Sequence, residues 1–506
     1  MRVLNFLFAL LAASLSFNAY AVSCDQPLQL GGDTGWTGWG NGHSNTRAAV
    51  EGISSEDIAT LELRWAFGFP GVGSVIGNPV VHENTVFIGV DSGDVYAIDA
   101  DTACVYWSFK AASGVRTAPA LALINSRQML FFGDRAANVY AVDASSGALI
   151  WQVEVDNHPA AILTGSPQFV HLQNASAPDR LLVPVSSSEE GIAAVPTYAC
   201  CTFRGSVVSL DANSGEKLWQ SYTIATAPAE TETNKFGPSG AAIWSPPTID
   251  LAKNRFYVTT GDAYSAPADS ATDAVMAMDL ESGVILWHTQ GTADDIWTVK
   301  CMTPAAPEEC GPDQDYGSPA MLVTTNDRSL LIAGQKSGNV RGFNPDTGEE
   351  LWRTALVENT DEFGGKIVWG GASDGEKVYF GIGTGGIHAI DITEGEIAWS
   401  TPLEPTADMA RHAGQDGPLT VSEDLVISGG WDGMLRILSA ADGRELWNYN
   451  TAISFTTING ETAKGGSMGA AGPVIAGRRL LVPSGYVGVK NGMPGNVLLM
   501  FAPATR

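Results

Sequence analysis

Basic residues are scarce in this chain, which holds 28 lysines and arginines against 55 aspartates and glutamates, for a formal net charge of −27 at pH 7. A charge of this size repels nucleic acid and anionic membranes and favours cationic partners. Long apolar runs are also missing, since no stretch beyond the start approaches the ~20 residues that a membrane-spanning helix needs. The sequence therefore predicts a protein without a nucleic-acid partner and without a transmembrane segment.

The first 21 residues have the features of a secretory signal peptide: one basic residue, an apolar run and the small-x-small end Ala19-Tyr20-Ala21. We expect residues 1–21 to be removed and residues 22–506 to form one domain in the periplasm or outside the cell. The sequence Ala21-Val22-Ser23-Cys24 faintly resembles a lipoprotein cleavage box but lacks its usual leucine, so a lipid anchor is the less favoured alternative.

Cysteine is rare but even in number, which in an exported protein predicts disulfides. We expect the pairs Cys24–Cys104, Cys200–Cys201 and Cys301–Cys310. The alternative for the two adjacent cysteines is that both thiols pair elsewhere or stay buried.

One phrase returns seven times along the chain: VYAIDADTACVYW, VYAVDASSGALIW, VVSLDANSGEKLW, VMAMDLESGVILW, VRGFNPDTGEELW, IHAIDITEGEIAW and LRILSAADGRELW. Each copy is a β-rich strand, a polar turn and a second strand that ends on tryptophan, which is the pattern of a hairpin. An eighth tryptophan, Trp65, has no hairpin before it, and the last strands of the chain have no tryptophan after them. We therefore expect an all-β, eight-bladed β-propeller whose last blade is closed by an N-terminal strand.

The repeat spacing locates the insertions. Successive tryptophans from Trp65 to Trp447 are 42, 44, 68, 68, 65, 47 and 48 residues apart, and a blade needs ~40–50. The third, fourth and fifth intervals therefore carry extra loops, and long loops on a rigid scaffold are common places for function. The eight repeat tryptophans themselves are expected to pack between blades rather than to contact a ligand.

Acidic residues gather in these inserted loops. Glu189 and Glu190 follow three serines, Asp262 ends the strand-like TTGD, and Asp313 and Asp315 lie in CGPDQDYG. Several carboxylates that converge on a propeller axis would suit a hard cation such as Ca²⁺. In a chain with 55 acidic residues, each one taken singly is more simply explained as solvated surface.

The order of motifs resembles that of the quinoprotein alcohol dehydrogenases, whose blades carry a tryptophan-docking repeat. Within that family the chain is most similar to polyvinyl alcohol dehydrogenases, in the phrases WTGWGNGHSNTR, GDRAANVYAVD, CCTFRGSVVSLD, GGSMGAAGPV and GMPGNVLLMF. The resemblance covers nearly the whole chain beyond residue 21. Members of that group commonly carry a haem domain, and this chain has no C-x-x-C-H motif.

The resemblance implies a set of metal ligands and a catalytic base. Glu189 matches the metal-binding glutamate, with Glu190 as the alternative if the register slips by one. Asp262 stands where the family usually has asparagine. Asp313 matches the catalytic aspartate, and Asp315 matches an additional aspartate that some relatives associate with lanthanides, so Ca²⁺ is expected with a lanthanide as the alternative.

The resemblance also implies a site for pyrroloquinoline quinone (PQQ). Trp244 matches the tryptophan that stacks on the quinone, the Cys200–Cys201 bridge would cover the opposite face, and Lys336 matches a basic residue beside the quinone carbonyl; the surface-turn alternative for Lys336 stays open. Further residues expected along the cofactor are Arg116, Arg135, Thr164, Ser186 and Trp369.

These residues imply an alcohol dehydrogenase that uses PQQ, oxidises secondary or other alcohols to ketones or aldehydes, and passes electrons to a soluble cytochrome c or another periplasmic acceptor. The alternative is a cofactor-free propeller that serves as a scaffold, similar to the outer-membrane assembly lipoproteins built from the same repeat.

Overall fold

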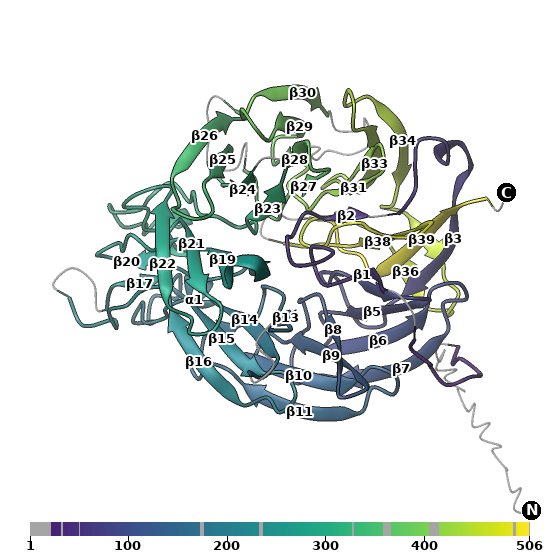
Figure 1. Ribbon diagram of the computed structural model, residues 1–506, viewed down its shortest axis with the longest axis horizontal. Coiled ribbons are helices and arrows are strands. Elements are labelled where there is room, and N and C mark those ends of the chain that lie inside the picture. Colours follow the sequence, from purple (N-terminus) through teal and green to yellow (C-terminus); the bar gives the residue numbers. More distant parts are fainter. Residues whose placement is uncertain are drawn as a thin grey trace, which may run out of the picture.

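Each of the seven hairpin repeats forms the two outer strands of an antiparallel sheet, and eight such sheets surround a central axis in the computed structural model (Figure 1). The structure describes residues 22–31, 34–49, 51–172, 177–231, 236–325, 328–357, 366–403, 414–488 and 492–504. The prediction of an eight-bladed β-propeller is confirmed. The expected signal peptide, residues 1–21, lies outside the described residues.

The blades follow one another along the chain, and each runs from an innermost strand near the axis to an outermost strand at the rim. Blade 1 is β4 (Val80–His82), β5 (Thr85–Gly89), β6 (Asp94–Asp99) and β7 (Val105–Lys110); blade 2 is β8 (Ala120–Ile124), β9 (Arg127–Gly133), β10 (Asn138–Asp143) and β11 (Leu149–Glu154); blade 3 is β13 (Gln168–Val170), β14 (Arg180–Ser187), β15 (Ser206–Asp211) and β16 (Lys217–Tyr222); blade 4 is β18 (Thr248–Asp250), β19 (Arg255–Thr259), β21 (Ala274–Asp279) and β22 (Ile285–Gln290).

The second half continues in the same way. Blade 5 is β23 (Met321–Thr324), β24 (Ser329–Gly334), β25 (Asn339–Phe343) and β26 (Glu350–Ala355); blade 6 is β27 (Ala372–Ser373), β28 (Lys377–Ile382), β29 (Gly386–Asp391) and β30 (Ile397–Pro402); blade 7 is β31 (Thr420–Ser422), β32 (Leu425–Gly429), β33 (Met434–Ser439) and β34 (Glu445–Asn450); blade 8 is β37 (Val474–Ala476), β38 (Arg479–Ser484), β39 (Val497–Pro503) and β3 (Leu61–Gly68).

Shorter elements lie between or beside the blades. They are β1 (Thr34–Trp36) on blade 1, β2 (Ala48–Ala49) on blade 7, β12 (Ala161–Ile162) against β14, the pairs β17 (Ser239–Gly240) with β20 (Ala263–Ser265) and β35 (Ser454–Thr456) with β36 (Thr462–Lys464), the helix α1 (Glu189–Ile192), and the 3₁₀ turns η1 (Ile58–Thr60), η2 (Leu251–Lys253) and η3 (Val299–Met302). No helix in the described ranges is long and apolar enough to cross a membrane.

The ring closes where the two ends of the chain meet. Strand β3 pairs antiparallel with β39, with Leu61 opposite Pro503 and Gly68 opposite Val497, and Figure 1 shows this contact between the purple and yellow ends. Because the pairing leaves blade 8 with a complete set of four strands, it removes an open edge that another chain could use.

The repeat tryptophans join each blade to the next one, as expected. The indole N–H of Trp107 donates to the carbonyl oxygen of Ala144 at 2.9 Å, and Trp65 donates in the same way to Ala100. The turn glycine of the following repeat lies directly against the ring: Gly147 has φ +71°, and a Cβ there would come within 2.7 Å of Trp107. Tryptophan and glycine therefore recur together, because the tryptophan ring of one blade packs against a turn of the next blade where there is no space for a side chain.

The segment from Trp39 to Ala49 lies inside the ring, against the inner strands. Successive backbone carbonyls accept N–H groups from four different blades: His43 from Ile249 at 2.9 Å, Ser44 from Leu322 at 3.1 Å, Thr46 from Ser373 at 2.9 Å and Arg47 from Val421 at 3.0 Å. The buried Arg47 guanidinium also donates to three backbone carbonyls, those of Leu419, Trp39 and Pro473. These contacts tie the segment to the inner strands of blades 4 to 7.

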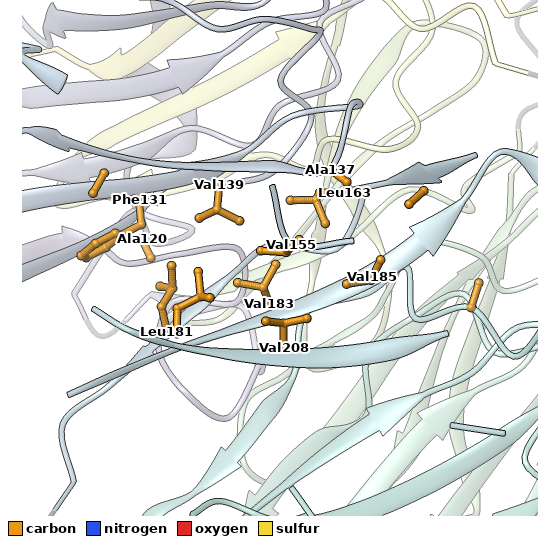
Figure 2. Packing of buried hydrophobic residues seen from close by; sticks show 14 of the residues in the cluster. Ala120, Phe131, Ala137, Val139, Val155, Leu163, Leu181, Val183, Val185 and Val208 are labelled. Carbon is orange, nitrogen blue, oxygen red and sulfur yellow. The ribbon is translucent and has the colours of Figure 1, made fainter. Parts of the chain in front are cut away.

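Apolar side chains fill the spaces between neighbouring blades. Figure 2 shows the cluster between blades 2 and 3, where Phe131 and Val139 face Val183 and Val208. The middle strands, such as β5 and β14, are buried along nearly their whole length because each sheet packs between two neighbouring sheets, whereas outermost strands such as β26 alternate between less and more exposed residues.

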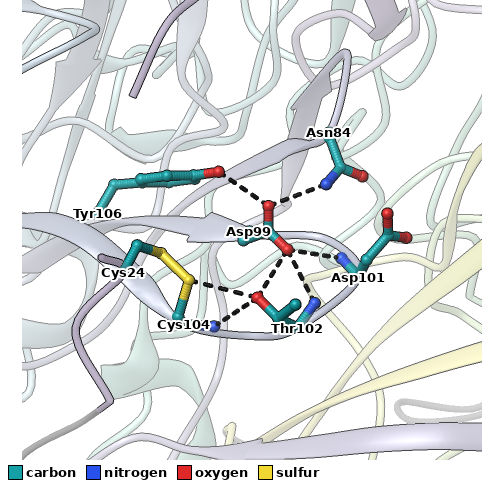
Figure 3. The surroundings of a disulfide bond; sticks show 7 residues. All are labelled: Cys24, Asn84, Asp99, Asp101, Thr102, Cys104 and Tyr106. Carbon is teal, nitrogen blue, oxygen red and sulfur yellow. Dashed lines mark hydrogen bonds between the residues drawn. A yellow bond between two sulfur atoms is a disulfide. The ribbon is translucent and has the colours of Figure 1, made fainter. Parts of the chain in front are cut away.

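Three disulfides are present, Cys24–Cys104, Cys200–Cys201 and Cys301–Cys310, which are the expected pairs. The first ties the N-terminal segment to the turn of blade 1 (Figure 3). In that turn Asp99 accepts hydrogen bonds from the backbone and hydroxyl of Thr102 and from the Tyr106 hydroxyl, each at 2.8 Å. The disulfide therefore attaches to a turn that is already held by a buried aspartate.

Candidate active site

A cavity of about 480 Å³ lies at the centre of the ring. Its walls come from two places that recur in each blade, the residues that lead into the innermost strand and those that follow the second strand. Because these strands are antiparallel, both places lie at the same end of a blade. Six blades or the connections that lead into them contribute lining residues, from Arg116 before β8 to Tyr486 after β38.

Most of the residues expected from the sequence meet in this cavity. Of the predicted cofactor and metal residues, the lining includes Arg116, Thr164, Ser186, Trp244, Asp262, Asp313, Asp315, Lys336 and Trp369. They come from eight separate segments, seven loops and the end of β14, that span about half of the chain. The three inserted intervals supply all the acidic lining residues.

Two tryptophans form an aromatic corner in the cavity. The rings of Trp244 and Trp369 stand edge to face, with centroids 5.2 Å apart and an interplanar angle of 85°. The Trp244 indole N–H donates to Asp315 at 3.2 Å, and Arg116 lies over the Trp369 ring at 4.3 Å. A Cβ on Gly317 would come within 2.3 Å of Trp244, so the chain beneath this ring has no space for a side chain.

Asp313 is held between two lysines. Its Oδ1 lies 2.7 Å from Lys336 Nζ, and its Oδ2 lies 2.5 Å from Lys366 Nζ. Burial alone would raise the pKa of Asp313, but the two ammonium groups lower it below its usual value. The carboxylate is therefore kept ionised. Burial alone would lower the pKa of Lys336, but the carboxylates of Asp313 and of Asp315, the latter at 2.5 Å, raise it above its ordinary value.

Asp262 is the least satisfied acid in the cavity wall. It is 1% exposed, and neither of its carboxylate oxygens has a hydrogen-bond partner among the described residues. Burial and the nearby charge of Asp315 raise the pKa of Asp262 well above its usual value. One oxygen each from Asp262, Asp313 and Asp315 lie within 4.8 Å of one another, which is a spacing that oxygen ligands of a hard cation adopt.

The two adjacent glutamates take different positions relative to the cavity. Glu189 is fully buried and faces away from the cavity, where its carboxylate accepts the Tyr198 hydroxyl at 2.7 Å and the backbone N–H groups of Thr202 and Phe203 at 2.9 Å. Glu190 lines the cavity instead. Burial raises the pKa of Glu190 to about 7, and the charges of Lys336 and Asp313 act on it in opposite directions.

Three further expected residues lie outside the cavity lining. The Arg135 guanidinium points to Asp91, at 3.4 Å, and about half of its side chain is exposed. The disulfide partners Cys200 and Cys201 are also absent from the lining; Cys201 is fully buried in the core cluster that contains Tyr264 and Ala242, which do line the cavity. The bridge therefore supports the wall from behind.

Several lining residues escaped the sequence analysis. Lys366 is the most important, since it is 5% exposed and contacts Asp313 directly. Its one sequence signal is its place three residues before Trp369. The others give the cavity an apolar side: Ile162, Ala242, Tyr264, Trp297, Val299, Met302, Val368 and Tyr486.

Comparisons with known proteins agree with this architecture. The family model PQQ_2, described as Outer membrane protein assembly factor BamB, matches residues 30–294 and 336–498. The polyvinylalcohol dehydrogenase of a Pseudomonas species is 36% identical over 94% of this chain and 78% of its own length, and that of Sphingopyxis sp. strain 113P3 is 33% identical over 95% and 78%. A europium-containing methanol dehydrogenase has the same fold, with a TM-score of 0.69, 16% identity, and coverage of 93% of this chain and 98% of its own.

Proposed function

Because the chain belongs to the quinoprotein alcohol dehydrogenase family together with the polyvinyl alcohol dehydrogenases, we propose that it oxidises alcohols to ketones or aldehydes, and above all secondary alcohols, including polyvinyl alcohol-like chains, to ketones. The cofactor would be PQQ with a bound cation. The observation that carries the proposal is the cavity in which Asp313, two lysines and an unpartnered Asp262 meet beside Trp244.

The residues of the cavity fit PQQ in size and in chemistry. A volume of about 480 Å³ is in the range of cofactor pockets. PQQ is a flat ring system with three carboxylates, and the cavity offers the Trp244 face together with donors for anionic groups. Arg116 and Ser186 line the wall, and the buried Thr164 hydroxyl has no partner among the described residues. These are the groups that would hold the cofactor.

The acidic side of the cavity fits a hard cation. Asp262, Asp313 and Asp315 present oxygens within 4.8 Å of one another, and Glu190 lines the same cavity. We therefore propose Glu190 rather than Glu189 as the glutamate ligand, since Glu189 already accepts three hydrogen bonds elsewhere. Ca²⁺ is the proposed ion, and a lanthanide is the alternative because Asp315 adds a further carboxylate.

In this proposal the oxidised alcohol loses a proton and a hydride. When bound, PQQ with its cation supplies the two-electron acceptor for the hydride. The proton goes to the carboxylate of Asp313, which Lys336 and Lys366 keep ionised. Lys336 Nζ also lies 5.3 Å from the Trp244 ring centroid, so its fixed charge stabilises negative charge above that ring.

The mouth of the cavity favours substrates with apolar carbon chains. Trp297, Val299 and Met302 line it from the loop around η3, and Met302 is 48% exposed. Trp297 is 8% exposed, so Met302 is the exposed apolar side chain of this group, and apolar lining beside polar groups is typical of sites that bind small molecules. This arrangement supports an alcohol whose carbinol carbon is flanked by carbon chain on both sides.

We place the protein in the periplasm, exported by residues 1–21, with residues 22–506 as one propeller domain. The electron acceptor would be a soluble cytochrome c or another periplasmic carrier, and the net charge of −27 would attract a basic one.

The test is dye-linked alcohol oxidation by purified apo-protein to which PQQ and either Ca²⁺ or a lanthanide are added. Primary alcohols, secondary alcohols and polyvinyl alcohol serve as substrates. We expect activity that needs both additions, is highest on secondary alcohols and is lost in Asp313→Asn, whereas Asp294→Asn, an exposed aspartate of the same loop, leaves activity unchanged. Absence of quinone binding would instead favour the scaffold alternative.

A further inference from the structure

A second group of carboxylates lies behind the cavity wall. One oxygen each from Asp262, Asp273 and Asp295 lie within 4.8 Å of one another, and all three side chains are at most 1% exposed. Asp262 follows β19, Asp273 precedes β21, and Asp295 lies between β22 and η3. Asp262 lines the cavity, but Asp273 and Asp295 do not.

Two of these three carboxylates, Asp262 and Asp273, lack the hydrogen-bond partners that buried charges normally have. Neither oxygen of Asp273 accepts a hydrogen bond from any described residue, and the same holds for Asp262. None of the three forms an ion pair with a lysine or arginine in the described part of the chain, in contrast to Asp313 and Asp315. Burying ionised carboxylates together without a countercharge is strongly unfavourable, so these side chains either keep their protons or hold a cation between them.

The spacing identifies the chemistry of such a cation. Oxygen ligands lie 2.3–2.6 Å from Ca²⁺, so two ligands of one ion can be up to about 5 Å apart, and the three aspartate oxygens lie within 4.8 Å. We infer that a second hard cation, such as Ca²⁺, binds between Asp262, Asp273 and Asp295. This buried site is additional to the proposed cavity cation, and Asp262 would bridge the two.

A cation there would act on the position of the catalytic loop. Asp295 accepts the backbone N–H of Asp313 at 3.1 Å and that of Gln314 at 2.7 Å. Asp295 is therefore placed to connect the buried cation to the chain that carries Asp313. Asp273 has no such contact with the loop, which makes it the residue to change when the site is tested.

The experiment counts bound ions in protein that contains no quinone. Wild type and variants are stripped with chelator and equilibrated with Ca²⁺ or, separately, Tb³⁺, and the bound metal is measured by mass spectrometry after equilibrium dialysis. We expect two ions per wild-type chain and one in Asp273→Asn. Glu190→Gln is the matched variant on the cavity side, and it should weaken the cavity ion while the buried ion stays.

A second measurement is needed if the substitution changes the folding of the protein and thereby the number of ions that it binds. In chelator, Asp273→Asn should have a Tm equal to or above that of wild type, because it removes a buried charge. Addition of Ca²⁺ should raise the Tm of wild type more than that of the variant. Equal Ca²⁺-induced shifts in both proteins would contradict the inference.

The outcomes separate this inference from the proposed function. One ion in wild type that Asp273→Asn retains would overturn the buried site and leave the cavity cation in place. One ion that is lost in Asp273→Asn but retained in Glu190→Gln would overturn the two-ion arrangement. A wild-type chain that binds no ion would overturn both the inference and the metal part of the proposed function.

Discussion

Exchange of either adjacent glutamate for glutamine distinguishes a structural role from a metal-binding one. In Glu189→Gln the amide nitrogen would face a donor, because both carboxylate oxygens accept hydrogen bonds from fully or partly buried groups. A hydrogen bond to a buried charged acceptor contributes about 1.5–3 kcal/mol to stability. The free energy of unfolding should therefore fall by about 3 kcal/mol in Glu189→Gln. At roughly 2 cal/mol/K per residue, the unfolding entropy of a chain of this length is about 1 kcal/mol/K, and the Tm should fall by about 3 °C.

Glu190→Gln should do the opposite. It removes charge from the cavity and breaks none of those hydrogen bonds, so the Tm in chelator should not fall. Affinity for Ca²⁺ should drop by about 100-fold or more, since even the loss of outer-shell partners costs about 10–100-fold. Thermal unfolding in chelator and calorimetric Ca²⁺ titration measure the two effects. A Glu189→Gln protein of unchanged Tm that binds Ca²⁺ as weakly as Glu190→Gln would refute the reasoning.

Three other predictions concern the blade contacts, the pH and the mouth of the cavity. Gly147→Ala should lower the free energy of unfolding by about 1–3 kcal/mol, whereas Gly73→Ala, which has open space around it, should change it little; urea titration compares them. Because the pKa of Glu190 is about 7, Ca²⁺ affinity should fall as pH drops below 7, and the Glu190→Gln titration should show a weaker pH dependence. Replacing Cys301 and Cys310 by serine should lower the free energy of unfolding by about 2.5 kcal/mol. The same replacement should raise the KM for long-chain alcohols more than the KM for small alcohols, which steady-state kinetics would measure.

The propeller could be predicted because its determinants are local and repeated. Trp107 meets Gly147 in the next copy of the repeat, and the same pair of residue types recurs around the ring. Each copy of the repeat therefore corresponds to one blade, and the number of blades follows from the sequence. The unpaired Trp65 strand at one end and the strand without tryptophan at the other end also indicated how the ring closes.

The site was predicted less completely, for physical reasons that differ between residues. Glu189 and Glu190 lie in the short helix α1, where neighbouring side chains point roughly 100° apart, so adjacency in sequence does not tell which one enters the cavity. Arg135 lies in a motif shared with the family, but its long side chain reaches out to Asp91. Lys366 belongs to no motif and was found through its contact with Asp313.

The sequence by itself determined the number of blades, the closure of the ring, the three disulfide pairs and the loops that carry the acids. Apart from the Cys24–Cys104 disulfide, which joins residues 80 positions apart, these features depend on residues that are close in the chain or on a pattern that repeats. Only the tertiary structure decided which acids share a space. Asp262, Asp273 and Asp295 come together because three segments of blade 4 and its connections meet near the axis, and the distance between residues in the chain carries no information about such a meeting.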